Sequence, residues 1–80
     1  MRYDVLIESK NSRWFFREDN KTYLRMPKNE NARVNEKELL EDLVWHPYED
    51  FGITCGALVI RVSHELDRYV YAPRAELILQ

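Results

Sequence analysis

Apolar residues occupy every second position near the start of the chain, and this alternation restricts the possible folds more than any other feature. They flank a polar, turn-forming stretch at residues 9–12 and comprise Tyr3, Val5, Ile7, Trp14 and Phe16. A period of two residues is typical of a β-strand with one buried face. With residues 10–11 as a two-residue loop, Ile7 lies opposite Trp14. The same register places Glu8 opposite Arg13, so the pattern predicts a β-hairpin with complementary charges.

The next turn, at residues 18–20, decides the register of a third strand. A three-residue loop with Asn20 in the left-handed backbone conformation places Trp14 opposite Leu24. A two-residue loop shifts the register by one residue and places Arg25 on the Trp14 face instead. Because burial disfavours a charged side chain on that face, we expect the longer loop and a meander of three strands.

A helix is predicted in the middle of the chain. Asn35 is followed three residues later by Glu38, which is a capping-box pattern for a first helical turn. Apolar residues then recur at spacings of three and four, as in an amphipathic helix, at Leu39, Leu40, Leu43 and Val44. The run ends at His46, because a residue that precedes proline avoids the helical backbone region. The sequence therefore predicts one short helix between Asn35 and His46.

Three further strands are expected in the second half of the chain. Residues 52–63 are predicted to form one central strand, because residues 57–60 are all apolar and indicate burial on both faces. Two shorter strands are expected at residues 68–72 and 75–79, separated by a turn that contains Pro73.

These elements favour a mainly β fold of the α+β class, in one globular domain over residues 1–80. Their order is three strands, one short helix and three strands, or βββ-α-βββ. We expect a small, strongly bent sheet or a partly open barrel that the helix closes at one end, with an open α+β sandwich as the alternative. The predicted shared core comprises Val5, Ile7, Trp14, Phe16, Leu24, Leu40, Leu43, Leu58 and Ile60.

The single cysteine bears on the cellular compartment. Cys55 cannot form an intramolecular disulfide and lies within the apolar run 53–60, so we expect a buried and unreactive thiol. The start of the chain lacks the apolar stretch of a secretory signal, and together these features predict a cytoplasmic protein. The longest apolar stretch, residues 56–60, is too short to span a membrane, so no membrane association is expected.

Charge is distributed unevenly along the chain, although the formal net charge is only −2. Residues 1–33 carry a net charge of +3 and residues 34–80 a net charge of −5, and the acidic excess lies between Glu36 and Asp50. Acidic residues on the predicted helix point away from its apolar stripe and form a candidate protein-binding surface at Glu38, Glu41 and Asp42. Such a surface repels phosphate groups, so it favours a protein as the partner.

A second candidate surface lies on the predicted amino-terminal sheet. The expected register aligns Leu6, Phe15 and Tyr23 in a row, and the flanking basic residues are Arg2, Arg13, Arg17, Lys21 and Arg25. Aromatic and basic side chains together bind RNA or single-stranded DNA by stacking and charge. The alternative is that this face is a second core layer, covered by other elements. Phe15, Tyr23 and Arg25 are the candidate binding residues that this surface supplies.

Catalytic and metal-binding patterns are sparse. His46 lies just before Glu49 and Asp50, and an imidazole beside carboxylates is a candidate acid–base centre, but no nucleophile accompanies it. Residues 64–67 do not have the spacing of metal ligands. The chain's two glycines do not form a phosphate-binding loop. No metal site and no cofactor are therefore predicted.

The leading hypothesis is a non-catalytic protein-interaction module, such as a small regulator or inhibitor of another protein. A small β-barrel that binds RNA or single-stranded DNA is the alternative, and an enzyme centred on His46 is the third hypothesis.

Overall fold

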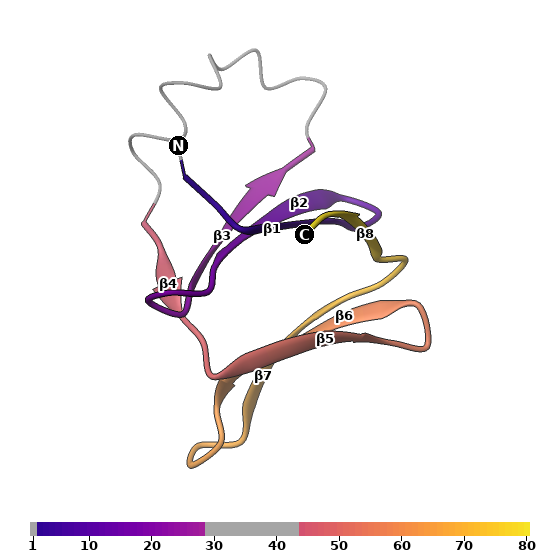
Figure 1. Cartoon of the computed structure of the whole chain (residues 1–80). Helices are drawn as coiled ribbons and strands as arrows, with labels where there is room; N and C mark the ends of the chain where they lie inside the picture. The colour runs from indigo at the N-terminus through magenta and orange to yellow at the C-terminus, as the bar shows by residue number, and fades with distance from the viewer. Residues whose placement is uncertain (1, 29–43) are drawn as a thin grey trace.

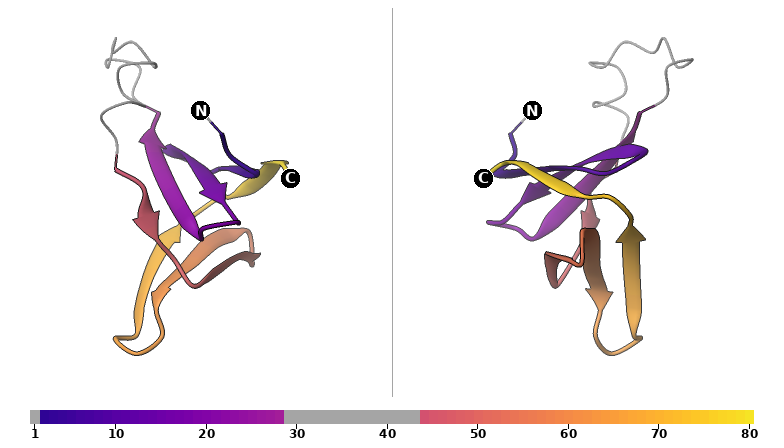
Figure 2. Two further views of the ribbon diagram at one scale, coloured as in Figure 1. Left: turned by 60° about the vertical axis from the view of Figure 1, so that its left-hand side comes forward. Right: turned by 90° about the vertical axis from the view of Figure 1, so that its right-hand side faces the viewer.

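Within residues 2–28 and 44–80, which the computed structural model describes, eight short strands form two antiparallel sheets (Figure 1). The five-stranded sheet contains, in spatial order, β4 (His46–Pro47), β3 (Thr22–Pro27), β2 (Ser12–Arg17), β1 (Val5–Glu8) and β8 (Glu76–Leu79). The three-stranded sheet contains β5 (Asp50–Thr54), β6 (Ala57–Ser63) and β7 (Arg68–Ala72). The sheets lie face to face, and their strands run across one another (Figure 2).

The predicted α+β class is wrong, because the described residues form an all-β fold without a helix. Residues 35–43 of the expected helix lie outside the described part of the chain. At residues 44–46 the backbone is not helical, and His46 belongs to β4, where it pairs with Tyr23. Extended backbone satisfies the constraint that Pro47 places on His46 as well as a helix end does. Two separate sheets, neither of which closes on itself, replace the expected single bent sheet or partly open barrel.

The β1–β2 hairpin confirms the first predicted register, in which Ile7 pairs with Trp14. Two buried serines close this hairpin. Trp14 Nε1 donates a 2.9 Å hydrogen bond to Ser9 Oγ, and Ser9 Oγ donates a 3.2 Å hydrogen bond to the backbone oxygen of Ser12. The serine hydroxyl therefore satisfies an indole N–H that is costly to bury without a partner.

The β2–β3 register differs from the expected register by one residue. Trp14 pairs with Arg25, whereas Leu24 pairs with Phe15. The expectation assumed that only one face of β2 is buried, but both faces are buried, so burial does not select a register. Arg25 fits on the Trp14 face because its Nε donates a 2.8 Å hydrogen bond to Ser12 Oγ. Its guanidinium carbon also lies 5.7 Å from the centre of the Trp14 ring, which is a cation–π distance.

Two hydrophobic clusters occupy the two faces of the five-stranded sheet. The main core lies between the sheets and contains Val5, Ile7, Trp14, Phe16, Tyr23, Tyr48, Leu58, Ile60 and Ala72. The second cluster contains Phe15, Leu24 and Met26, with Tyr3, Leu6 and Trp45 packed against it. The predicted core residues of β1, β2 and β6 are thus confirmed. Leu24 belongs to the second cluster instead, and Leu40 and Leu43 lie outside the described residues.

The predicted single strand over residues 52–63 is wrong, because the chain reverses at Cys55 and Gly56. These two residues have positive φ angles of 52° and 75°, as the tightest turns between twisted antiparallel strands require. Gly56 adopts this backbone without a steric cost. β5 and β6 therefore form a hairpin, and Cys55 is exposed at its tip, not buried as expected. The two later strands are confirmed as β7 and β8.

We predict that Trp14→Ala lowers the free energy of unfolding by about 3–5 kcal/mol, because it removes a buried ring from a small core. Denaturant unfolding followed by circular dichroism measures the change. Tyr69→Ala serves as the control, since this ring is 52% exposed on β7 and its loss costs about 1 kcal/mol or less. Equal stability of the two variants would contradict the core position of Trp14.

We also predict that a thiol reagent modifies Cys55 in the folded protein nearly as fast as in denaturant, because the residue is exposed in a turn. The reaction is followed by mass spectrometry, and Cys55→Ser provides the blank. Modification that requires prior unfolding would show that the β5–β6 turn is placed wrongly.

Candidate binding groove

β8 forms one edge of the five-stranded sheet and is exposed along its whole length. It pairs with β1 on one side, and within the described residues no strand pairs with its other side. The exposed fractions of Leu77, Ile78 and Leu79 are 45%, 49% and 49%. An edge strand presents unpaired N–H and C=O groups along one side, which makes it a template for a further strand.

The apolar side chains of β8 lie on both faces of the sheet. Leu77 pairs with the buried Ile7 of the main core, whereas Leu79 pairs with Leu6 of the second cluster, because the register shifts between these two pairs. Paired residues of antiparallel strands share a face, so the two leucines lie on opposite faces. A strand added beside β8 would therefore find apolar contacts above and below its backbone.

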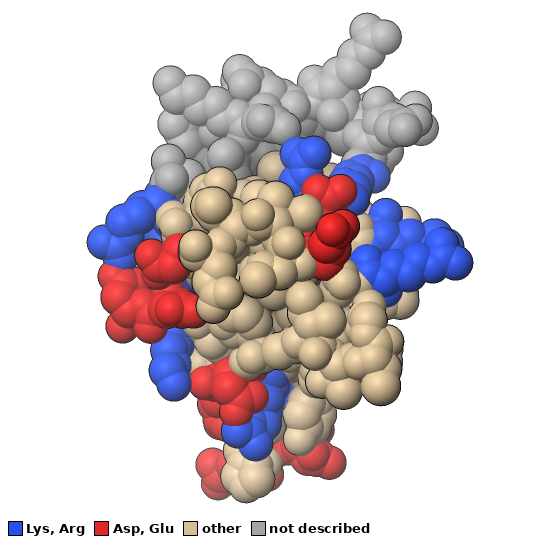
Figure 3. Space-filling view, turned by 45° about the vertical axis from the view of Figure 1, so that its right-hand side comes forward, with Lys and Arg blue, Asp and Glu red and all other residues tan. Residues whose placement is uncertain are grey.

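A groove of about 610 Å³ lies beside β8, between β1 and β8 of one sheet and β5 of the other. Its apolar part is lined by Val5, Ile7, Tyr48, Phe51, Ile53 and Leu77. β5 is the edge strand of its own sheet, so an edge strand of each sheet lines the groove. On the side of the molecule where β8 lies, uncharged surface fills the middle and charged side chains lie around it (Figure 3).

Charged side chains also line the groove, and carboxylates predominate among them. The lining includes Glu18, Glu49 and Asp50 but a single lysine, Lys21. Lys21 Nζ donates a 3.2 Å hydrogen bond to the backbone oxygen of Glu49. This bond of the ammonium group is thus to a backbone oxygen and not to one of the carboxylates. Burial raises the pKa of the Tyr48 phenol, and the negative charges of Glu18 and Asp4 raise it further.

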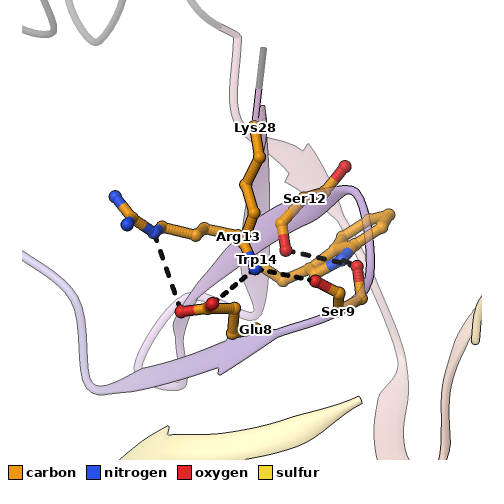
Figure 4. Close-up of polar contacts among 6 residues, drawn as sticks. All are labelled: Glu8, Ser9, Ser12, Arg13, Trp14 and Lys28. Carbon is orange, nitrogen blue, oxygen red and sulfur yellow. Dashed lines mark hydrogen bonds and ion pairs between the residues drawn. The ribbon is translucent and has the colours of Figure 1, made fainter. Parts of the chain in front are cut away.

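Basic residues neutralise one member of a pair of like charges where β8 meets β1. The register places Glu8 opposite Glu76, an arrangement that destabilises a sheet when both carboxylates are unpaired. Lys28 Nζ pairs with Glu8 Oε1, and Arg13 Nε lies 3.8 Å from Glu8 Oε2 (Figure 4). The hydrogen bond from Lys28 lowers the pKa of Glu8, and the charge of Arg13 acts in the same direction. The positive charges of Lys28 and Arg13 beside Glu8 therefore reduce the repulsion between Glu8 and Glu76.

The structure separates the residues predicted for the aromatic and basic surface. Phe15 is 6% exposed in the second cluster, and Tyr23 is 8% exposed in the main core on the opposite face. Burial raises the pKa of the Tyr23 phenol. Arg25 lies on the Trp14 face. The predicted acidic residues, Glu38, Glu41 and Asp42, lie outside the described residues.

The basic residues of that predicted surface have partners within the protein. Arg2 pairs with Asp19, and Arg17 Nε donates a 2.8 Å hydrogen bond to the backbone oxygen of Arg2. The guanidinium of Arg17 also lies 3.9 Å from the centre of the Trp45 ring. Because these arginines already have partners within the protein, their positive charges are less available to bind phosphate.

The cluster around His46 is also divided. Tyr48 is buried in the main core, and Arg61 pairs with the carboxylates of Glu49, at 3.7 Å, and of Asp50. His46 is exposed on β4, with its ring 5.7 Å from that of Tyr23. In residues 2–28 and 44–80, no three histidine, cysteine, aspartate or glutamate side chains are grouped as metal ligands.

Sequence reasoning predicted the strand of β8 but not its role. The three consecutive apolar residues 77–79 resemble the apolar run that was assigned to a strand covered on both faces. Edge position depends on the pairing with β1, some seventy positions earlier in the chain, and no local pattern reveals it.

Comparison with protein-family models, with curated proteins and with solved structures finds no match to this chain. Among the residues that the structure describes, no helix is long and apolar enough to cross a membrane.

We predict that Lys28→Met raises the pKa of Glu8 toward its usual value near 4.5, as measured by NMR titration of the carboxylate. A lowered pKa in the folded state stabilises the protein above pH about 4.5, and this stabilisation is lost as the pH falls through the folded value. Lys10→Met, in the exposed β1–β2 turn, is the control. Equal pKa values of Glu8 in both variants would exclude Lys28 as the cause.

Proposed function

We propose that this protein is a non-catalytic interaction module that binds an extended segment of another protein by strand addition at β8. The observation that carries this proposal is the position of β8. It is an edge strand with apolar side chains on both faces, and it borders an apolar groove. Strand addition obtains affinity from backbone hydrogen bonds and specificity from side chains that enter neighbouring pockets.

The free energies of side-chain burial and of association explain why the bound segment must also contact the groove. Complete burial of the three half-exposed side chains of residues 77–79 contributes roughly 2–4 kcal/mol, at about 1.5–3 kcal/mol for each full side chain. Association costs at least about 4 kcal/mol in lost translational and rotational freedom. The edge alone therefore gives little net affinity, and a segment that also places alternate side chains in the groove gives more.

The charges of the groove indicate the chemistry of the segment. Three carboxylates and one ammonium line it, and Arg61 pairs with the carboxylates of Glu49 and Asp50. The carboxylate of Glu18 is therefore the group that attracts a basic residue of the segment and repels an acidic one. We infer an extended apolar segment that carries a lysine or arginine near the carboxylate of Glu18.

The same observations weigh against the other hypotheses. A base can stack only on an exposed ring, and the rings of Phe15 and Tyr23 are buried. The carboxylates of Glu49 and Asp50 are engaged by Arg61, so they do not orient His46 as a general base would require. The role of regulator or inhibitor, and the cytoplasmic location, stay predictions.

A photo-crosslinking experiment in the source cell tests the proposal. A benzophenone amino acid at position 78 is expected to yield an adduct with another protein, because this position lies on the exposed edge. Leu77→Lys should abolish the adduct, since a charge on an edge strand blocks strand addition. Leu66→Lys is the matched control, because Leu66 is 65% exposed in the turn after β6 and does not line the groove.

Three outcomes would contradict the proposal. One is an adduct that Leu77→Lys leaves unchanged while thermal unfolding shows the variant to be folded. Another is an adduct that nuclease removes, which would favour the nucleic-acid hypothesis. The third is an adduct of twice the mass of the chain, which would indicate a second copy as the partner.

A further inference from the structure

A second pocket, of about 530 Å³, opens on a different side of the sheets from the groove, and we call it the aromatic pocket. It lies between strands β2 and β3 of one sheet and β7 of the other. The residues that matter for its chemistry are Ser12, Trp14, Tyr23, Arg25, His46 and Tyr71. Its volume lies within the range of about 300–1,000 Å³ that is usual for sites of small ligands.

The charge of the aromatic pocket is opposite to that of the groove. Its described lining contains Arg25 and His46 and no carboxylate, whereas three carboxylates line the groove. In a chain of net charge −2, a concave surface with basic groups alone attracts anions selectively.

Two buried serines hold the important side chains of the aromatic pocket. Ser9 and Ser12 are 5% and 2% exposed, and they are the buried polar residues of the described chain. Ser12 Oγ accepts the 2.8 Å hydrogen bond from Arg25 Nε, and Ser9 Oγ accepts the 2.9 Å bond from Trp14 Nε1. The guanidinium and the indole are thus fixed before a ligand arrives, which lowers the entropy lost on binding.

The oriented guanidinium and the rings suit different parts of one ligand. The terminal nitrogens of an arginine bind the two oxygens of a carboxylate with matching geometry. Tyr71 is 68% exposed and offers a ring face, whereas the buried Trp14 forms the floor. Flat apolar groups pack well against such aromatic walls.

We propose that the aromatic pocket binds a carboxylate carried on a planar aromatic body, with Arg25 on the carboxylate and Tyr71 against the ring. This inference is independent of β8 and of the proposed function. The same chemistry occurs in free aromatic acids and in peptides that end in an aromatic residue, and the experiment distinguishes these two sources.

NMR spectroscopy of the ¹⁵N-labelled protein provides the test, because the chain contains two tryptophans and hence two indole N–H signals. The variant Trp45→Phe lacks one of these signals, so the signal that remains belongs to Trp14. 2-Naphthoate is expected to shift the Trp14 signal in a saturable manner and to leave the Trp45 signal unchanged, since Trp45 packs on the opposite face of the sheet. The neutral analogue 2-naphthalenemethanol should bind about tenfold more weakly or worse, because it lacks the charge.

Substitutions separate the anion contact from general effects on the fold. Arg25→Gln should weaken 2-naphthoate binding about tenfold or more and leave the alcohol unaffected. Arg68→Gln is the matched control on β7, where an exposed arginine does not line the aromatic pocket. Ser12→Ala should lower the acid-to-alcohol affinity ratio, which a loss of stability alone would not change. Tyr71→Ala should weaken both compounds equally.

Binding measurements with peptides identify the source of the ligand. Acetyl-Gly-Gly-Phe with a free carboxylate is compared with its amide and with 2-naphthoate. Tighter binding of the peptide acid indicates a chain terminus, and tighter binding of 2-naphthoate indicates a free acid. The proposal is overturned if no acid shifts the Trp14 signal, if acid and alcohol bind equally, or if Arg25→Gln and Arg68→Gln behave alike.

Discussion

A stack of aromatic rings around Phe16 joins the two sheets, and the rest of the structure depends on it. The Phe16 ring is fully buried and lies 3.9 Å from the Phe51 ring, nearly parallel to it, so β2 of one sheet rests on β5 of the other. Tyr48 meets Phe16 edge-on at 5.6 Å and lies in the connection between the sheets. Each such pair contributes about 0.5–1.5 kcal/mol beyond the area that it buries. A domain this small buries a smaller fraction of its surface than a larger one does, so these contacts between the sheets contribute a large share of its stability.

Aromatic residues between the sheets also line the two open sites. The strands of the two sheets cross (Figure 2). Tyr48 and Phe51 of the aromatic stack line the groove, whereas Trp14 and Tyr23 line the aromatic pocket, and the two sites share no lining residue. The carboxylates that line the groove come from the β2–β3 turn and from the start of β5. Arg25 lines the aromatic pocket because the observed β2–β3 register places this arginine opposite Trp14. One residue of register therefore determines the charge of one site, and the predicted register would have left this pocket without its guanidinium.

The sequence was sufficient to predict one local pairing, that of β1 with β2, but not the β2–β3 register, the β5–β6 turn or the pairing of distant segments. The β1–β2 register was predictable because a two-residue loop permits one arrangement with complementary charges. The β2–β3 register was not, because apolar residues at adjacent positions such as Phe15 and Phe16 satisfy burial in either alignment. The turn at Cys55 and Gly56 was hidden in an apolar run that also suits a central strand. The position of β8 beside β1, and hence the groove, depends on contacts across the whole chain.

The position of β8 conflicts with its composition, and this conflict is the physical basis for expecting a partner. A strand with apolar side chains on both faces normally lies inside a sheet, with strands on either side. Natural edge strands are protected by charges, proline, bulges or a covering element. β8 has a register shift and one charge, Glu76, at its start, but residues 77–79 are apolar and about half exposed. The other edge of the same sheet, β4, has only two residues, His46 and Pro47, and the proline has no N–H to donate. One edge of the sheet is thus protected against strand addition and the other is suited to it.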